Sequence, residues 1–168
     1  MDVETRLKKL GLVLPEPMQP PPGVELPFAW VRVRGNRAYV SGHGPLNPDG
    51  SLCGPFGKVG TEVSPEVSSE VSPEEGYEAA RGCALSVLAS LKRELGDLDR
   101  VEAWLVVHGL VNTAPDFGGT AGVVNGFSDL ILELYGPEAG MHARTAPGVA
   151  TLPLNHAVFV AAEVEITA

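Results

Sequence analysis

Residues 101–111, V-E-A-W-L-V-V-H-G-L-V, predict a β-strand with two largely apolar faces. Strict alternation places Ala103, Leu105 and Val107 on one face and Trp104, Val106 and Leu110 on the other. A strand of this kind is covered on both sides. The two helices predicted below can cover only one side of the sheet, so we expect a second copy of the chain to cover the other. The strand therefore predicts an oligomer.

Two amphipathic helices flank this strand in the sequence. The first is predicted over residues 73–95, with Ser72 as N-cap, Glu75 completing a capping box and Gly96 ending the helix. Its apolar stripe comprises Ala80, Cys83, Ala84, Val87, Leu88, Leu91 and Leu95. The second is predicted over residues 120–135, with Val123, Val124, Phe127, Leu130, Ile131 and Leu134 facing inward.

The remaining strands lie towards the two ends of the chain. Residues 28–34 and 37–42 predict a hairpin joined by the two-residue turn Gly35-Asn36. A strand carrying Arg144 and a last strand over residues 158–166 complete the set. The order strand, strand, helix, strand, helix, strand, strand predicts an α+β fold whose two helices pack on one face of the sheet.

The chain divides into a short N-terminal segment and one domain. Residues 1–27 predict a helix, with Val3, Leu7 and Leu10 at helical spacing, and a proline-rich linker. Residues 28–168 are expected to form a single domain with an insertion at about residues 61–70. Within it, Val63-Ser64-Pro65-Glu66 repeats the later Val71-Ser72-Pro73-Glu74 without making a second helix start.

Composition excludes several classes of partner. The net charge of −9 argues against nucleic acid and against an anionic membrane surface. The N-terminus resembles neither a signal peptide nor a membrane span, so we expect a cytoplasmic protein. Cys53 and Cys83 have no metal spacing and are expected to be reduced, with Cys83 in the core.

Residues 140–153, G-M-H-A-R-T-A-P-G-V-A-T-L-P, hold the candidate binding residue. Arg144 is the one arginine in this small, mostly apolar run. Burying an arginine without a partner is costly, and a guanidinium binds a carboxylate through two parallel hydrogen bonds. The residue is therefore a candidate anion anchor; the alternatives are a structural ion pair or an exposed strand end.

The four histidines do not predict a metal site, because no pair has ligand spacing on a helix and the cysteines do not join them. His43, in the turn after the second strand, could act as an acid or base near neutral pH, or be a solvated loop residue. His142 shares the Arg144 face. His108 is expected on the Trp104 side of its strand, and His156 indicates only a turn. Nucleophile-elbow and phosphate-loop motifs are absent from the sequence.

Several motifs together resemble the Rid (YjgF-like) family. They are Val40-Ser41-Gly42-His43-Gly44-Pro45, Val124-Asn125-Gly126, His142-Ala143-Arg144-Thr145 and Leu152-Pro153, in the order of elements given above. The likeness runs from Phe28 to the C-terminus, leaving out residues 61–69, and is strongest to a longer branch of the family.

This resemblance implies a chorismate-mutase-like fold and a homotrimer with three clefts between neighbouring subunits. The best-known members hydrolyse imine and enamine intermediates, such as 2-imino acids, to keto acids and ammonia, without a metal or an organic cofactor. Their arginine grips the substrate carboxylate, and that role falls on Arg144. The expected partners are thus a small carboxylate-bearing metabolite and the chain itself.

Further site residues are implied by the same resemblance. Phe28 would line the cleft, Gly42 would offer backbone groups, and the backbone carbonyl of Ala146 would hold water or the imine. Asn125 would contact the substrate or make a helix-to-loop hydrogen bond. His43 would be a proton carrier.

The chain departs from the family at one position that bears on catalysis. In the deaminases a glutamate fifteen residues after the arginine positions the attacking water, and here that residue is Phe159. Glu163 lies on the same strand face, but about 13 Å further along the strand. Two hypotheses follow: an imine hydrolase, or a non-catalytic protein that binds a small carboxylate. Ribonuclease or translation-inhibitor activity, described for some members, ranks third.

Overall fold

The computed structural model describes residues 2–61 and 70–167, so most of the predicted insertion lies outside the described residues. Its helices are α1 (Val3–Lys9), α2 (Pro73–Leu95) and α3 (Thr120–Gly140), with short 3-10 turns η1 (Leu98–Arg100) and η2 (Pro153–Asn155). Its strands are β1 (Val31–Arg34), β2 (Arg37–His43), β3 (Val101–Asn112), β4 (Ala143–Thr145), β5 (Gly148–Val149) and β6 (Val158–Ile166).

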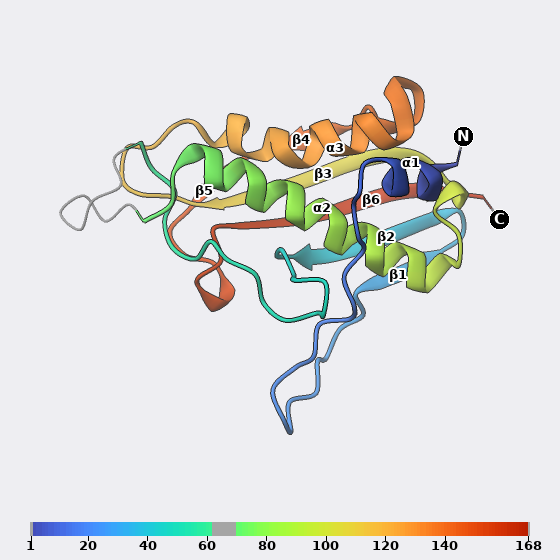
Figure 1. The fold of residues 1–168 in the computed structure, drawn as a ribbon, viewed down its shortest axis with the longest axis horizontal. Helices are drawn as coiled ribbons and strands as arrows, with labels where there is room; N and C mark the ends of the chain where they lie inside the picture. The colour runs from blue at the N-terminus through green and yellow to red at the C-terminus, as the bar shows by residue number, and fades with distance from the viewer. Residues whose placement is uncertain (1, 62–69, 168) are drawn as a thin grey trace.

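The strands form one sheet in the order β1-β2-β6-β3-β4, and β5 pairs with β3. Helices α2 and α3 run side by side across the same face of it (Figure 1). The predicted α+β architecture, with two helices on one face, is therefore confirmed.

The first hairpin has the predicted two-residue turn, because Arg34 pairs directly with Arg37 and Gly35 takes the positive φ of 59° that the turn needs. β1 is shorter than expected, since it begins at Val31 instead of Phe28. Pro27 cannot donate a ladder hydrogen bond. The Phe28 ring instead packs edge-on against Trp30, with ring centroids 5.1 Å apart.

Helix α2 begins and ends where its caps predict. Ser72 Oγ accepts a hydrogen bond from the Glu75 amide, and the Glu75 carboxylate accepts one from the Ser72 amide. Gly96 ends the helix in the left-handed region, with φ of 80°. Cys83 is buried in the core, as expected.

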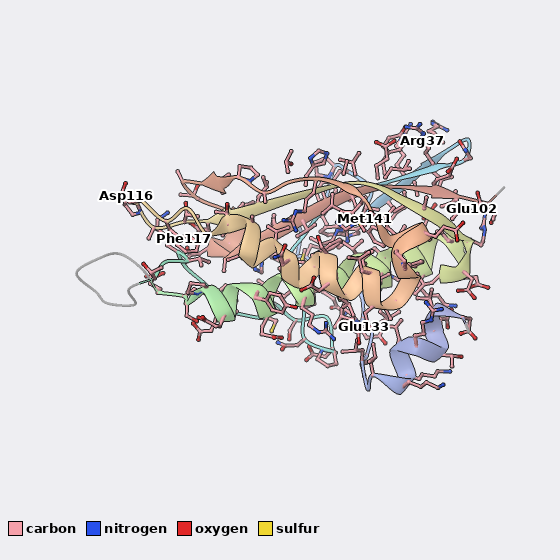
Figure 2. The ribbon with its side chains drawn as sticks, turned by 90° about the horizontal axis from the view of Figure 1, so that it is seen from above. Arg37, Glu102, Asp116, Phe117, Glu133 and Met141 are labelled. Carbon is pink, nitrogen blue, oxygen red and sulfur yellow. The ribbon has the colours of Figure 1, made fainter. Side chains whose placement is uncertain are left out.

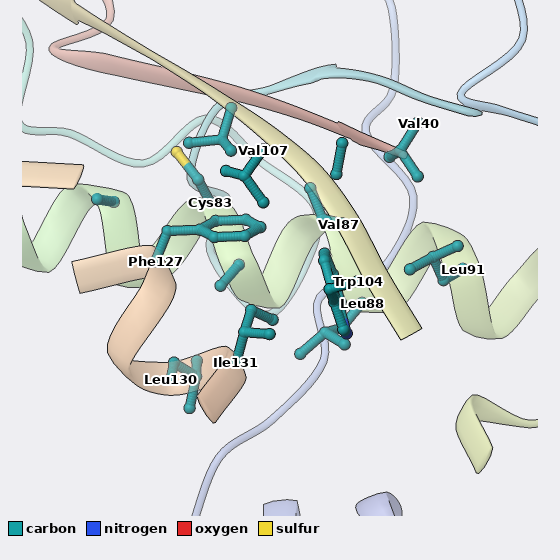
Figure 3. Packing of buried hydrophobic residues seen from close by; sticks show 14 of the residues in the cluster. Val40, Cys83, Val87, Leu88, Leu91, Trp104, Val107, Phe127, Leu130 and Ile131 are labelled. Carbon is teal, nitrogen blue, oxygen red and sulfur yellow. The ribbon is translucent and has the colours of Figure 1, made fainter. Parts of the chain in front are cut away.

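Strand β3 contains two register shifts against β6, one between Val101 and Ala103 and one between Trp104 and Val106. Each shift disturbs the alternation of faces. As a result Trp104 and Val107 are both buried, and Trp104 meets Phe127 of α3 edge-on at 5.7 Å (Figure 3). The prediction that placed these two side chains on opposite faces is wrong.

The prediction for His108 is wrong for the same reason. Its ring is exposed, and its Nδ1 lies 3.1 Å from Thr145 Oγ1 of β4, whereas Trp104 is buried against α3. His108 therefore lies on the face of the sheet that the helices leave open.

Helix α3 runs five residues beyond its predicted end and bends at Gly136, which has φ of 75° and precedes Pro137. Near its middle the helix crosses α2 at very close range. A Cβ added at Gly126 would lie 2.0 Å from the Tyr77 carbonyl oxygen, so only glycine permits this approach.

Strand β6 alternates as predicted. Its helix-facing residues, Val158, Val160, Ala162, Val164 and Ile166, are buried. Phe159 and Ala161 remain half-buried on the opposite face, next to Leu110 of β3. Among the described residues, the helices all lie on the other side of the sheet (Figure 2). The open face is therefore apolar around Leu110, Phe159 and Ala161, whereas Glu163 and Glu165 further along β6 make it charged.

The N-terminal segment packs onto the domain. Val3 and Leu7 of α1 belong to the core cluster, and the amide of Val3 donates to Asp99 beyond α2. Within residues 2–61 and 70–167, we find no helix with the length and apolarity that crossing a bilayer requires.

Candidate functional site

A largely apolar pocket of about 240 Å³ opens where β2 ends. Four residues of the predicted site line it: Phe28, Gly42, His43 and Phe159. The wall also includes Met18 and Leu26 from the N-terminal segment, Leu46 and Leu52 from the loop after β2, and Ser90 and Arg93 from α2. Trp30, Gly44, Pro153, Leu154 and His156 complete it. Linker residues thus contribute to a pocket whose other walls belong to the domain.

His43 is the last residue of β2 and is buried, not solvated. Its Nδ1–H donates to the Ser41 carbonyl at 2.5 Å, so the neutral ring presents an unprotonated Nε2 to Ser90 Oγ at 2.8 Å. Burial is the main cause that lowers the pKa of His43 to about 4, and the nearby Arg93 adds to the shift. The ring is therefore neutral at pH 7 and held at both nitrogens.

Arg144, half-buried on β4, faces α3 and is held by neutral groups. Its Nη1 donates to Asn125 Oδ1 at 2.8 Å and to Ser128 Oγ at 3.0 Å, and its Nη2 contacts the Ala121 carbonyl at 3.4 Å. Three of the five guanidinium N–H donors are therefore engaged. The described residues include no carboxylate in an ion pair with Arg144, so its positive charge is not neutralised within them.

The two histidine–arginine clusters repeat one arrangement. Arg93 Nη2 donates to Ser90 Oγ at 3.0 Å, and that hydroxyl faces His43 Nε2. Likewise Ser128 Oγ, which accepts from Arg144, faces Nε2 of His142 at 2.9 Å. In both clusters the histidine Nδ1 donates to the carbonyl two residues before it. The sequence did not indicate either serine, because a serine inside a helix gives no distinctive signal.

Within one chain the predicted site is divided. Arg144 on β4 pairs with Val107 of β3. Phe159 on β6 pairs with Leu110, three residues further along β3 and on its other side. That separates their backbones by about 10 Å along the strands and about 10 Å across them. Arg144 also points to the helix layer, whereas Phe159 lies on the open face.

Two other predicted site residues, Asn125 and Ala146, lie near Arg144. Asn125, expected to contact the substrate or to make a helix-to-loop hydrogen bond, accepts a hydrogen bond from Arg144 on β4. Ala146 is partly buried against the core, in the gap between β4 and β5. Pro147 lies in the same gap on the sheet edge, where it has no N–H to donate to a ladder hydrogen bond.

His156, which the sequence assigned only to a turn, is a residue of the pocket. His156 follows η2, is only 1% exposed, and lines the pocket beside Phe159, with ring centroids 5.0 Å apart. Its Nδ1 is buried without a hydrogen-bond partner among the described residues. Burial lowers the pKa of His156, so the ring is neutral. The sequence showed only a histidine after a Leu-Asn turn, which carries no such signal.

We also looked for a metal centre. In the part of the chain that the structure describes, no three His, Cys, Asp or Glu side chains come together in an arrangement that could hold an ion.

The comparisons with known proteins agree with this fold. Residues 22–166 match the family model described as "YjgF/chorismate mutase-like, putative endoribonuclease". The chain is 40% identical over 144 residues to Protein TCP17 of Trypanosoma cruzi, covering 86% of this chain and 89% of that protein.

Two crystal structures resemble the chain over nearly its whole length. The protein Atu1372 of Agrobacterium tumefaciens, of unknown function, is 34% identical with a TM-score of 0.79, covering 98% of this chain and 91% of that one. A putative endoribonuclease from Shewanella oneidensis is 29% identical with a TM-score of 0.84, covering 99% and 100%. With a family model spanning residues 22–166 and these relatives, the chain belongs to the YjgF-like (Rid) family.

Proposed function

We propose that the protein is a cofactor-independent imine hydrolase that converts 2-imino acids to keto acids and ammonia. One observation carries the proposal: the Arg144 guanidinium is fixed by Asn125 and Ser128, neutral groups that orient it without cancelling its charge. Two of its N–H donors remain for a ligand, which is the number a carboxylate engages in a bidentate pair.

We further propose that the site is completed by a second chain in a homotrimer. Arg144 lies on β4 at one edge of the sheet, and the pocket lies where β2 ends, with β6 and β3 between them, so one subunit would supply the arginine and its neighbour the pocket with Phe28 and Gly42. The half-buried Leu110, Phe159 and Ala161 on the open face support such contacts, because an apolar surface of this kind is usually buried by a partner.

In this arrangement the arginine fixes the substrate carboxylate and leaves the imine carbon open to water. Holding a reactant in one orientation removes much of the entropic part of the barrier. His43, proposed from the sequence as a proton carrier, fits a positioning role better. Its pKa of about 4 and its two hydrogen bonds keep it neutral and occupied at pH 7.

The test is the Arg144→Ala variant, assayed with freshly generated 2-iminobutyrate and by titration with 2-oxobutyrate. We expect both turnover and binding to fall at least about 100-fold, because a charge-assisted bidentate pair contributes about 3 kcal/mol or more. Arg81→Ala is the matched control, since Arg81 forms an ion pair with Glu133 on the helix layer. Undiminished binding and turnover in Arg144→Ala would exclude the proposed role.

Phe159 favours a second candidate, a protein that binds a small carboxylate without turning it over. A phenyl ring at this position cannot position water as a carboxylate does, so ground-state binding could persist without rate acceleration. Binding of 2-oxobutyrate without 2-iminobutyrate turnover would select this candidate, and gain of turnover in Phe159→Glu would support it further. A net charge of −9 disfavours RNA as a substrate.

A further inference from the structure

His156 is a buried polar side chain with an unmet hydrogen bond. The residue is 1% exposed, and its Nδ1 has no partner among the described residues. Leaving a buried polar nitrogen unpaired costs about 1–3 kcal/mol. Native proteins rarely accept this cost without a water, a ligand or a functional reason.

The ring forms part of the pocket wall and is closely packed by groups that offer its Nδ1 no hydrogen bond. Phe56 and Phe159 flank it, with ring centroids at 5.5 and 5.0 Å. Gly44 also lines the pocket, and a Cβ added there would lie 2.9 Å from His156 Cε1 and 3.0 Å from Nδ1. Any side chain at residue 44 would therefore clash with the edge of the ring that carries the unpaired nitrogen, so glycine is required there.

The position of the ring matters because Phe159 stands where the resemblance places the glutamate of the deaminases. His156 is the polar side chain that packs against this phenyl ring, three residues earlier in the chain. The pocket is otherwise mostly apolar, and both nitrogens of its other histidine, His43, are already engaged.

We infer that His156 forms a hydrogen bond with the carbonyl or imine group of the bound ligand and so provides the polar contact that Phe159 cannot make. A neutral imidazole can present Nδ1 as a donor to a carbonyl oxygen or as an acceptor from an iminium N–H. This inference rests on the proposed function, because it assumes that a 2-oxo or 2-imino acid enters the pocket.

The probe for the test is 2-oxobutyrate, the keto acid corresponding to 2-iminobutyrate, added to the full chain with ¹⁵N-labelled histidines. We expect the His156 ring nitrogen signals to move on saturation. In His156→Phe, which keeps a ring but has no nitrogen, we expect affinity to weaken about 3- to 10-fold, the effect of one hydrogen bond. His156→Asn, which restores a polar group, should recover part of the loss.

Phe56→Leu is the control for packing, because Phe56 contacts the His156 ring but does not line the pocket. Its affinity should stay within about 2-fold of wild type if packing alone contributes little. Ring signals that stay fixed at saturating 2-oxobutyrate, with wild-type affinity in both His156 variants, would overturn the role of His156.

Arg144→Ala separates this inference from the proposed function. If that variant loses 2-oxobutyrate binding while the His156 signals never move in wild type, the proposed function stands and the His156 contact fails. If Arg144→Ala binds as tightly as wild type, the proposed function fails. No binding of 2-oxobutyrate to the wild-type protein would overturn both.

Discussion

The charge state of a single residue, His43, strongly affects the electrostatics of the pocket. The ring is buried, its Nδ1–H is bound to the Ser41 carbonyl and its Nε2 faces Ser90 Oγ, so protonation would replace a good contact with a buried charge. The folded state lowers the pKa of His43 from 6.5 to about 4. Between these values the unfolded chain binds more protons than the folded one.

Folding stability should therefore fall as the pH drops from about 6.5 to about 4, because protons favour the unfolded state in this window. His43 alone accounts for up to about 3 kcal/mol of the loss, at 1.36 kcal/mol for each pKa unit. Urea unfolding at pH 7 and pH 4 measures it. His43→Gln should lose less stability than wild type between these two pH values, whereas His108→Gln, at an exposed histidine, should match wild type.

The sequence identified Arg144 as an anion anchor candidate but did not show which groups hold it. Asn125 was assigned by resemblance to the substrate or to a helix-to-loop hydrogen bond, and in the structure its Oδ1 accepts from Arg144 on β4. Ser90, Ser128 and His156 were missed because they become neighbours of the site only after the chain has folded. A hydroxyl inside a helix or a histidine after a turn has no periodic signature, so local sequence carries no information about these contacts.

At the scale of elements, helices were easier to predict than strand faces. The capping box at Ser72 and the glycine at residue 96 are local signals, and both ends of α2 agree with them. The faces of β3 depend on register shifts against β6, a strand nearly fifty residues away. The sequence of β3 itself gives no signal of these shifts. Trp104 and Val107 were consequently separated by a rule of alternation that the strand does not follow.

The crossing of α2 and α3 gives a prediction with an internal control. Alanine is usually better than glycine in a helix, by about 1 kcal/mol. At Gly126 the added Cβ would lie 2.0 Å from the Tyr77 carbonyl oxygen, so Gly126→Ala must push the helices apart. We expect a net loss of about 1–3 kcal/mol in the free energy of unfolding.

Gly122 lies one helical turn earlier on α3, and a Cβ there would meet nothing within 4 Å. Gly122→Ala should therefore gain up to about 1 kcal/mol from helix propensity alone. Urea unfolding of both variants measures the difference. Equal effects of the two substitutions would show that the close crossing does not limit the packing of the helices.

For the whole molecule, the decisive question is whether one chain or two build the site. The helix-facing core is complete in one chain, with Trp104, Phe127 and Leu88 almost fully buried. The open face is not, because Leu110, Phe159 and Ala161 remain partly exposed there. A symmetric ring of subunits would cover this face and could bring the Arg144 edge of one subunit to the pocket of the next.

Shared sites have a consequence that a site within one chain lacks: two inactive variants can restore each other. Arg144→Ala removes the anchor. Gly42→Leu blocks the pocket without a backbone clash, because a Cβ at Gly42 meets only Phe159 Cδ2 at 3.6 Å.

Trimers formed at random from equal amounts of the two variants would have about one quarter of their clefts built from an intact arginine and an intact pocket. Co-refolded mixtures should then regain about a quarter of wild-type 2-oxobutyrate sites, counted by titration, while sedimentation reports trimers for each variant alone. A mixture with no recovered sites, despite mixed trimers, would exclude a cleft shared between subunits, because random assembly creates intact clefts whenever neighbouring subunits share them.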